Sequence, residues 1–324
     1  MTRPAAEHEE LMVRAAELYF YEGHTQAVVA ERLGTTRWTV GRLLEDARHA
    51  GIVRVVIDHP RARRHDAEVR LKQAFGLREA VVLAAQPNAA VTAQAVWAAA
   101  ARHLTALRPA PKRMAVSWGR TVAGIAAELP AGWTRGLEVV QTNGGPTRAQ
   151  GNPVGDSLYA LAAKGGGAVR GLAAPTIVER ADLARLLRAD RSAASVLQAA
   201  EACRTMLYAP GTVDPDSVLV RSGYVTAAEM RAMAAAGAVG DVMSHFIAGD
   251  GSLADPDLDA RTLSISLDAV RRCPTVIAVA TGERRQAAAL AAVRAGLCTT
   301  LITDSAVAAA LLAAAGSFDQ PLKG

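Results

Sequence analysis

Cysteine, lysine and aromatic residues are all scarce in this chain of 324 residues. The three cysteines, Cys203, Cys273 and Cys298, lie far apart and match no zinc-ligand spacing, which favours a reduced compartment over a disulfide framework. Aromatic residues make up only 4% of the sequence, so alanine, valine and leucine are expected to fill the core. No run of about 18 consecutive apolar residues occurs, and the start lacks the order of a signal peptide. We therefore expect no membrane span.

Basic residues are concentrated near the start of the chain, although the formal net charge is only +5. Between Arg37 and Arg64 lie seven arginines and three acidic residues. Clustering of this kind is the electrostatic signature of a module that binds nucleic acid. Five of the seven histidines also precede residue 66, but their spacing matches no ligand pattern. We expect surface histidines there and no metal site.

The segment from Thr25 to Val53 predicts two short helices joined by a tight turn. Thr25, and then Thr35 or Thr36, are residues that cap helix N-termini, and Gly34 accepts the left-handed backbone of the turn. The residues expected to face inward recur at three- and four-residue spacing: Val28, Val29, Leu33, Val40, Leu43 and Leu44. The second helix then exposes a basic face, which is typical of a DNA-binding helix-turn-helix. An ordinary helical hairpin with solvated arginines is the alternative.

The exposed face of the second helix is expected to read double-stranded operator DNA. On this hypothesis Arg37, Thr39 and Arg42 enter the major groove. Thr36 and Arg32 hold phosphates, and Trp38 is assigned to packing or to a contact with the DNA backbone.

The flanking segments complete a DNA-binding domain over residues 1–58. Residues 9–22 predict a helix that packs across the helix-turn-helix. The run 52–58 predicts a short strand, which would form a small wing. Residues 59–77 predict a linker helix that serves as a dimer contact or as a lever between domains. Residues 78–324 have a different sequence pattern and are expected to form a second, effector-binding domain.

Apolar strands alternate with alanine-rich helices in this second domain. The candidate strands are 79–85, 113–118, 137–143, 168–174, 204–209, 218–223, 275–282 and 298–304. Such alternation predicts an α/β, Rossmann-like fold with a mainly parallel sheet covered by helices on both faces. Ligands of such sheets bind outside the carboxyl ends of the strands, often at helix N-termini.

Three of the strand ends carry polar turns that contain glycine. The first is Ser117–Trp118–Gly119–Arg120–Thr121, where N–H groups and hydroxyls at a helix start suit a phosphate. The second surrounds Asn143, Gly144 and Gly145, where the backbone has room to approach a ligand. The third is Thr281–Gly282–Glu283–Arg284–Arg285, with cationic groups beside N–H donors.

We expect one pocket in which the first and third turns face each other. Ser117, Gly119 and Thr121 would donate hydrogen bonds to a phosphate or to a dense set of hydroxyls, and Arg285 would supply the charge. Asn143 and Asp250 would read sugar hydroxyls, because an amide donates and accepts while a carboxylate accepts. In the alternative, these turns merely pack helices on the sheet and the cavity is closed.

Other functional classes find less support in the sequence. Neither GxGxxG after a strand nor GxxxxGK[ST] occurs, so we predict no nucleotide cofactor. An enzyme would need a general acid and base in the pocket, yet the second domain holds only His103 and His245, outside the glycine turns. We predict that the protein is not an enzyme. A sugar-phosphate isomerase-like enzyme and an effector-independent DNA-binding protein are the alternatives.

Several stretches of the chain together carry a family resemblance. They are LYFYEGHTQAVVAERLGTTRWTVGRLLEDARHAGIVRVVI, VSWGRTVAGIA, QTNGG, VRSGYVTAAEMRAMAAAGAVGDVMSHFIAGDG and VIAVATGERRQAAALAAVRAGLCTTLITD. From about Leu11 to the last helix, the chain resembles the SorC family of bacterial sugar-binding transcriptional regulators, which includes deoxyribonucleoside and central glycolytic gene repressors. The resemblance implies a cytoplasmic homodimer or homotetramer. It also implies a domain similar to sugar-phosphate isomerases that binds a phosphorylated sugar or a related metabolite.

Two departures from the family pattern bear on the effector. Where the pattern has Gly-Gly after the late strand and a lysine at the next helix start, this chain has Thr281–Gly282 and Arg285. Arginine also suits a phosphate and offers a bidentate fork. Some relatives hold an aldehyde sugar through a lysine, but residues 141–153 contain none. The resemblance therefore implies a non-covalent effector: a phosphorylated sugar, a sugar alcohol or its phosphate.

Overall fold

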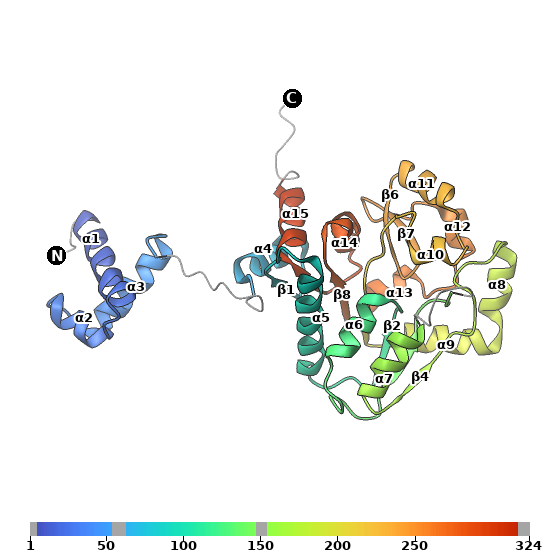
Figure 1. The fold of residues 1–324 in the computed structure, drawn as a ribbon, viewed down its shortest axis with the longest axis horizontal. Helices are drawn as coiled ribbons and strands as arrows, with labels where there is room; N and C mark the ends of the chain where they lie inside the picture. The colour runs from blue at the N-terminus through green and yellow to red at the C-terminus, as the bar shows by residue number, and fades with distance from the viewer. Residues whose placement is uncertain (1–4, 54–62, 147–153, 317–324) are drawn as a thin grey trace. The chain divides into compact units, whose positions relative to one another are not determined.

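The computed structural model of the chain describes residues 5–53, 63–146 and 154–316 (Figure 1). Contacts within the chain divide it into two compact units, Met1–Asp58 and His59–Gly324. The wing strand predicted for 52–58 falls mainly on residues outside the described ranges. Among the described residues, no helix combines the length and the apolarity that a membrane crossing requires.

The described part of the first unit is helical. Its elements are α1 (Ala5–Ala16), the π-helical turn η1 (Glu17–Tyr21), α2 (Gln26–Arg32) and α3 (Arg37–His49). Thr25 caps α2 by accepting a hydrogen bond from the Val28 N–H at 3.4 Å, and Thr36 caps α3 by accepting one from the Thr39 N–H at 3.1 Å. Gly34 adopts a φ of 59° in the turn between them. Two helices and a tight turn therefore lie where the sequence predicts them.

A small apolar core holds these helices together. Its buried members are Met12, Ala15, Ala16, Leu18, Val29, Ala30, Val40, Leu43, Leu44 and Ala47. Val28 was predicted to face this core but is 37% exposed. The buried stripe of α2 runs instead through Val29 and the partly buried Leu33, four residues apart on one helix face.

The second unit contains the following elements. The helices are α4 (His65–Phe75), α5 (Ala89–Ala106), α6 (Arg120–Glu128), η2 (Gly155–Tyr159), α7 (Ala160–Lys164), α8 (Ala181–Ala189), α9 (Arg191–Glu201), α10 (Val218–Arg221), α11 (Ala227–Ala235), α12 (Pro256–Ala260), α13 (Leu267–Arg272), η3 (Glu283–Arg285), α14 (Gln286–Arg294) and α15 (Ser305–Gly316). The strands are β1 (Glu79–Leu83), β2 (Arg113–Val116), β3 (Glu138–Gln141), β4 (Ala168–Arg170), β5 (Thr205–Tyr208), β6 (Ala238–Val242), β7 (His245–Ala248), β8 (Thr275–Ala280) and β9 (Thr300–Asp304).

The main sheet of this unit is parallel throughout. Its strand order is β1-β9-β8-β5-β2-β3-β4. Successive strand residues enter opposite cores: Ile277 and Val279 pack with α5 and α6, whereas Val276 and Ala278 pack with α13 and α14. Burial on both faces explains why these strands are continuous apolar runs and why the sequence predicts a covered parallel sheet.

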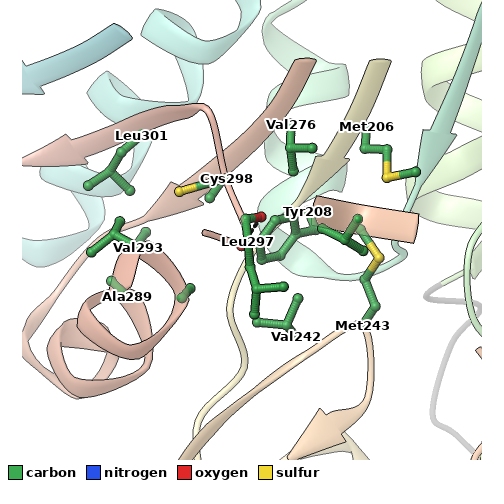
Figure 2. Close-up of a cluster of buried hydrophobic side chains, with 14 of the residues drawn as sticks. Met206, Tyr208, Val242, Met243, Val276, Ala289, Val293, Leu297, Cys298 and Leu301 are labelled. Carbon is green, nitrogen blue, oxygen red and sulfur yellow. Dashed lines mark hydrogen bonds between the residues drawn. The ribbon is translucent and has the colours of Figure 1, made fainter. Parts of the chain in front are cut away.

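Tyr208, at the end of β5, anchors the core on the second of these faces (Figure 2). Its ring is fully buried, and its hydroxyl donates a hydrogen bond to the carbonyl oxygen of Leu297 at 3.0 Å. A buried phenol hydroxyl needs a hydrogen-bond partner, and the partner here lies in the turn between α14 and β9. The bond therefore joins the central strand of the sheet to that turn.

The segment 59–77, predicted as a linker, packs as part of the second unit in its described portion. Leu71 of α4 is fully buried in the same core as Ala80 and Val82 of β1. The buried carboxylate of Glu68 accepts a hydrogen bond from the Val82 N–H at 2.9 Å. α4 is therefore fixed to the first strand of the sheet.

One local prediction was wrong, and one element was missed. Residues 218–223 were expected to form a strand but contain the short helix α10, which Ser217 caps by accepting a hydrogen bond from the Val220 N–H at 3.3 Å. A short apolar run is compatible with a helix or a strand, and here the cap at Ser217 favours the helix. The sequence also missed the antiparallel hairpin of β6 and β7. Its turn residues, Met243 and Ser244, have φ values of 51° and 73°, a conformation usually signalled by glycine or asparagine.

Candidate functional site

The turns that follow β8, β5, β2 and β3 gather at one edge of the sheet, because these strands are parallel and adjacent. Only β5 separates the turn at 117–121 from the turn at 281–285, so their strands lie roughly 10 Å apart. The end of β5 contacts the later turn: Nε of Arg285 donates a hydrogen bond to the Pro210 carbonyl oxygen at 3.1 Å. The structure thus brings both predicted turns to one edge.

Two arginines lie close together at this edge. Arg285 is partly buried, and its guanidinium donates to the backbone carbonyl oxygens of Pro210 and Thr281. Burial lowers the pKa of Arg285, and the charge of Arg120 lowers it further, while Asp241 opposes both effects. Arg120 is exposed at the first position of α6. The edge therefore holds two cations that repel each other, and an anion between them would relieve the repulsion.

The start of α6 adds backbone donors beside these charges. Gly119 precedes the helix with a φ of 141°, a region that favours glycine, and its N–H donates to Oγ of Ser157 at 3.3 Å. Among the residues that the structure describes, no side chain caps α6, so the N–H groups of its first turn have no side-chain acceptor within that part of the chain. The helix dipole favours negative charge at this end. Thr121, predicted as a hydroxyl donor, is buried in this turn.

Asn143 and Ser117, predicted on separate turns, contact each other directly. Ser117 Oγ donates to Oδ1 of Asn143 at 3.1 Å, and Thr142 Oγ1 donates to the same oxygen at 2.8 Å. Nδ2 of Asn143 donates to Oγ of Ser244 at 2.9 Å. All four side chains are buried. The Asn143 amide thus ties β2 and β3 to the β6–β7 turn.

Gly144 and Gly145 serve a close approach within the protein. A Cβ atom on Gly144 would lie 2.3 Å from the carbonyl oxygen of Pro175. The Gly144 carbonyl accepts hydrogen bonds from Nε1 of Trp118 at 2.8 Å and from Oγ1 of Thr176 at 2.7 Å. The turn was predicted to let the backbone approach a ligand. At Gly144 the backbone instead approaches residues 174–176 of the protein itself.

Asp304, which the sequence did not single out, occupies the donors of the turn at 281–285. Its Oδ2 accepts hydrogen bonds from Oγ1 of Thr281 and from the Gly282 N–H, both at 2.8 Å. Glu283 to Arg285 form a 3-10 turn, in which Glu283 is exposed and Arg284 pairs with Asp214 at 2.7 Å. The Thr281 hydroxyl and the Gly282 N–H are therefore engaged inside the protein, and Arg285 contacts the backbone beyond β5.

Asp250 lies away from this edge, contrary to expectation. Its carboxylate accepts hydrogen bonds from the N–H and Oγ of Ser252 at 2.9 and 2.7 Å. The adjacent Gly251 contacts Ala291 and Ala295 near the end of α14, whereas Arg285 directly precedes the start of that helix. Nine helical residues, roughly 13 Å, separate the two positions.

Asp241 is the carboxylate at the edge. Its backbone pairs with Gly211, just beyond β5, through hydrogen bonds of 2.8 and 3.2 Å. Its Oδ2 accepts the Ser244 N–H at 2.9 Å. Burial raises the pKa of Asp241, and the Ser244 N–H together with the charges of His245 and Arg285 opposes the rise. A Cβ atom on Gly211 would lie 1.8 Å from Oδ1 of Asp241, so glycine is required at that point.

His103 and His245, the two histidines of residues 78–324, are poorly placed for catalysis. Nδ1 of His245 lies 2.5 Å from Oδ1 of Asp259, and its Nε2 lies 2.8 Å from the Ile265 carbonyl oxygen. Both ring nitrogens thus face protein acceptors. His103 lies near Glu79, which begins β1 and therefore marks the opposite edge of the sheet. The described residues contain no cluster of three or more histidine, cysteine, aspartate or glutamate side chains suited to a metal.

The exposed face of α3 carries the predicted DNA contacts. Arg37 and Arg42 are exposed on this face, and Thr39 is partly exposed. Thr36 and Thr39 share a hydroxyl–hydroxyl hydrogen bond of 2.9 Å. Arg32 on α2 pairs with Glu22 at 3.1 Å. Trp38 is 70% exposed, so its side chain does not pack in the core of this unit, and the other predicted role, a contact with the DNA backbone, stays a prediction.

Comparisons with known proteins place the chain in a family. Residues 59–313 match the family model described as "Putative sugar-binding domain". The chain is 31% identical over 318 residues to the transcriptional regulator LsrR of Enterobacter sp. (strain 638), covering 96% of this chain and 95% of that protein. The full-length sorbitol operon regulator SorC from Klebsiella pneumoniae is structurally similar, with a TM-score of 0.69, 26% identity and coverage of 94% and 99% of the two chains. The chain belongs to the SorC family.

Other SorC-type relatives agree with this result. The deoxyribonucleoside regulator of Bacillus subtilis (strain 168) is 29% identical over 308 residues, covering 94% of this chain and 98% of that protein. These SorC-family relatives are bacterial transcriptional regulators. The protein is therefore a transcriptional regulator with a sugar-binding domain, as its sequence predicts, and the α/β fold with a mainly parallel sheet is also confirmed.

Proposed function

We propose that this regulator binds a small phosphorylated carbohydrate at the carboxyl edge of the sheet and that this ligand controls its affinity for operator DNA. The observation that carries the proposal is the placement of two cations at one edge of the sheet: Arg120 begins α6, which no described side chain caps, and Arg285 contacts the backbone beyond β5. A phosphate ester carries about 1.5–2 negative charges at neutral pH and three acceptor oxygens. It would match both guanidinium groups and the N–H donors of the helix. A sugar alcohol without phosphate would leave the repulsion in place.

The carbohydrate hydroxyls would be read by groups next to the arginines. Asp241 offers a carboxylate that interacts with the charge of Arg285. The hydrogen-bonded set around Asn143, with Ser117 and Ser244, lies on the other side of β5. Buried polar groups with fixed partners discriminate hydroxyl positions well, because a mismatch leaves them unpaired.

A thermal-shift screen tests this ligand class. The probes are pentose and hexose phosphates, polyol phosphates and the matching free sugars and polyols. A ligand that binds only the folded protein adds about 2.7 kcal/mol of stability at a concentration of 100 times its dissociation constant. We expect phosphate esters to raise the melting temperature and their unphosphorylated counterparts to have little effect. Stabilisation by free polyols alone would instead favour a ligand held by Asn143 and Asp241.

Two aspartates next to glycine provide a matched test of hydroxyl reading. Asp241→Asn keeps an oxygen for the Ser244 N–H but removes the charge, so the affinity for the effector found by the screen should fall by about 0.5–1.5 kcal/mol, as for one hydrogen bond. Asp250→Asn should leave the affinity unchanged, because Asp250 lies at the far end of α14. Isothermal titration calorimetry of both variants checks this. A loss confined to Asp250→Asn would contradict the placement of the carbohydrate.

DNA is proposed to meet the protein through α3. Arg37, Thr39 and Arg42 would enter the major groove, and Thr36 at the helix start would contact a phosphate. Arg32 would contact a phosphate only by leaving its ion pair with Glu22. The relatives of this chain are regulators of transcription, which supports this assignment.

Assembly into at least a dimer is expected, and a tetramer on DNA is proposed. One helix-turn-helix reads only a few base pairs, so specificity calls for paired half-sites about one helical turn, or a multiple, apart. Multi-angle light scattering of the full chain at micromolar concentration, with and without operator, measures this. A monomer under both conditions would contradict the expectation.

We further propose that the protein acts in the bacterial cytoplasm and does not turn over its ligand. Both nitrogens of His245 face acceptors within the protein, and His103 lies at the opposite edge of the sheet. An acid–base pair for isomerisation would need a second titratable side chain beside Asp241 that is free to exchange protons with the ligand, and neither histidine is placed to be that side chain. Product formation when the pure protein is incubated with sugar phosphates would overturn this proposal.

A further inference from the structure

Trp38 and Arg42 form a pair on the exposed face of α3. They lie four residues apart, which places them on one face of the helix. The Cζ atom of Arg42 lies 5.0 Å from the centroid of the Trp38 ring. This distance is within the range of a cation–π contact.

The pair contributes little to the folding of the first unit. Trp38 is 70% exposed and is not a member of the buried cluster built from Val29, Val40, Leu43 and their neighbours. An exposed cation–π contact stabilises a fold only weakly. A large indole ring kept in water on the basic face of a helix therefore has a better explanation in binding than in folding.

The contact with the Trp38 ring restricts Arg42 without using its hydrogen-bond donors. A guanidinium that lies against an aromatic face keeps its N–H groups in the plane, pointing outward, where a planar bidentate acceptor can meet them. Arg32 on α2 differs, because Glu22 occupies its guanidinium at 3.1 Å. Among the described residues no carboxylate pairs with Arg42, so its donors are available.

We infer that Trp38 is a positioning residue for sequence reading: it holds the guanidinium of Arg42 in the orientation that donates two hydrogen bonds to O6 and N7 of a guanine, an inference that rests on the proposed reading of DNA by α3. Arginine bound in this way to guanine is the commonest specific contact in the major groove. Fixing the side chain beforehand lowers the conformational entropy lost on binding. Trp38 therefore sets base preference at the position that Arg42 contacts.

The test uses the full chain and a duplex selected by it from a random pool. Trp38→Ala should weaken binding to the selected duplex by about five- to tenfold, somewhat less than the loss of a whole bidentate contact. Binding to a random duplex should change by less than about twofold, because phosphate contacts remain. Trp38→Phe keeps an aromatic face and should retain most of the preference. Tyr21→Ala is the control, since Tyr21 is 90% exposed in the same unit but lies outside α3.

A double-mutant cycle distinguishes positioning from an independent contact. If Trp38 acts through Arg42, the double replacement Trp38→Ala with Arg42→Ala should weaken binding no more than Arg42→Ala alone. Replacing the guanine that Arg42 contacts should likewise abolish the effect of Trp38→Ala. Additive losses, or equal losses on selected and random duplexes, would overturn the inference. A wild-type protein that enriches no sequence from the pool would overturn the DNA-reading function itself, and the inference with it.

Discussion

Arg285→Ala is expected to weaken binding of a phosphorylated carbohydrate by about 1.5–3 kcal/mol, the contribution of one charge-assisted hydrogen bond. The variant removes the partly buried cation of the carboxyl edge together with its hydrogen bonds to the backbone carbonyl oxygens of Pro210 and Thr281, two buried residues. Calorimetric titration with the phosphate ester found by the screen measures the loss. The fold and the affinity for operator DNA without effector should persist.

Arg284→Ala is the matched control for this prediction. Arg284 is the adjacent residue with the same charge, but it is exposed and pairs with Asp214 at 2.7 Å. Its replacement should leave the affinity nearly unchanged, because exposed ion pairs contribute little. Equal losses in both variants would indicate a general effect of net charge. Unchanged affinity in Arg285→Ala would remove the phosphate assignment and favour an unphosphorylated polyol.

Asp304→Ala is expected to destabilise the second unit by at least about 3 kcal/mol, because buried donors left without an acceptor cost roughly 1–3 kcal/mol each. The Asp304 carboxylate, 1% exposed, accepts hydrogen bonds from Thr281 Oγ1 and the Gly282 N–H on one oxygen. Its other oxygen accepts the N–H groups of Ala306 and Val307 at the start of α15. One side chain thus joins the ends of β8 and β9 to a helix.

Urea unfolding followed by tryptophan fluorescence measures this loss. Trp97, Trp118 and Trp133 all lie in the second unit, so they report on its transition. Asp250→Ala provides the comparison, since Asp250 is exposed and bonds only to Ser252 among the described residues. That variant should stay within about 0.5 kcal/mol of the wild type. Similar small losses in both variants would show that Asp304 does not hold this turn together.

The architecture of the sheet was predictable from the sequence because its strands are buried on both faces. In a strand, side chains alternate between the two faces of the sheet, so a continuous apolar run such as 275–282 is buried only if helices cover both faces. The turn at Gly34 was predictable for a different reason: its φ of 59° is a conformation that glycine adopts readily and other residues rarely adopt. The run 218–223 escaped because a short apolar segment fits helix and strand alike.

The position of Asp241 at the carboxyl edge of the sheet was not predictable, and the reason is topological. Gly240–Asp241 and Gly249–Asp250 carry the same local signal, an aspartate after glycine. Asp241 reaches the carboxyl edge because its backbone pairs with Gly211 beyond β5, whereas the turn of Asp250 packs on the end of α14. Both Gly-Asp turns can be identified in the sequence. Which of the two aspartates lies near Arg285 depends on how the hairpin of β6 and β7 folds.

One titration tests directly whether a phosphorylated carbohydrate controls this regulator. Fluorescence anisotropy of the selected duplex, bound to the full-length protein at fixed salt, is followed while a polyol phosphate from the screen or the same polyol without phosphate is added. We predict that the phosphate ester changes the affinity for the duplex and that the free polyol does not. The change should be lost in Arg285→Ala and kept in Arg284→Ala. An equal response to both members of the pair, or a response that survives in Arg285→Ala, would contradict a phosphate site at the carboxyl edge of the sheet.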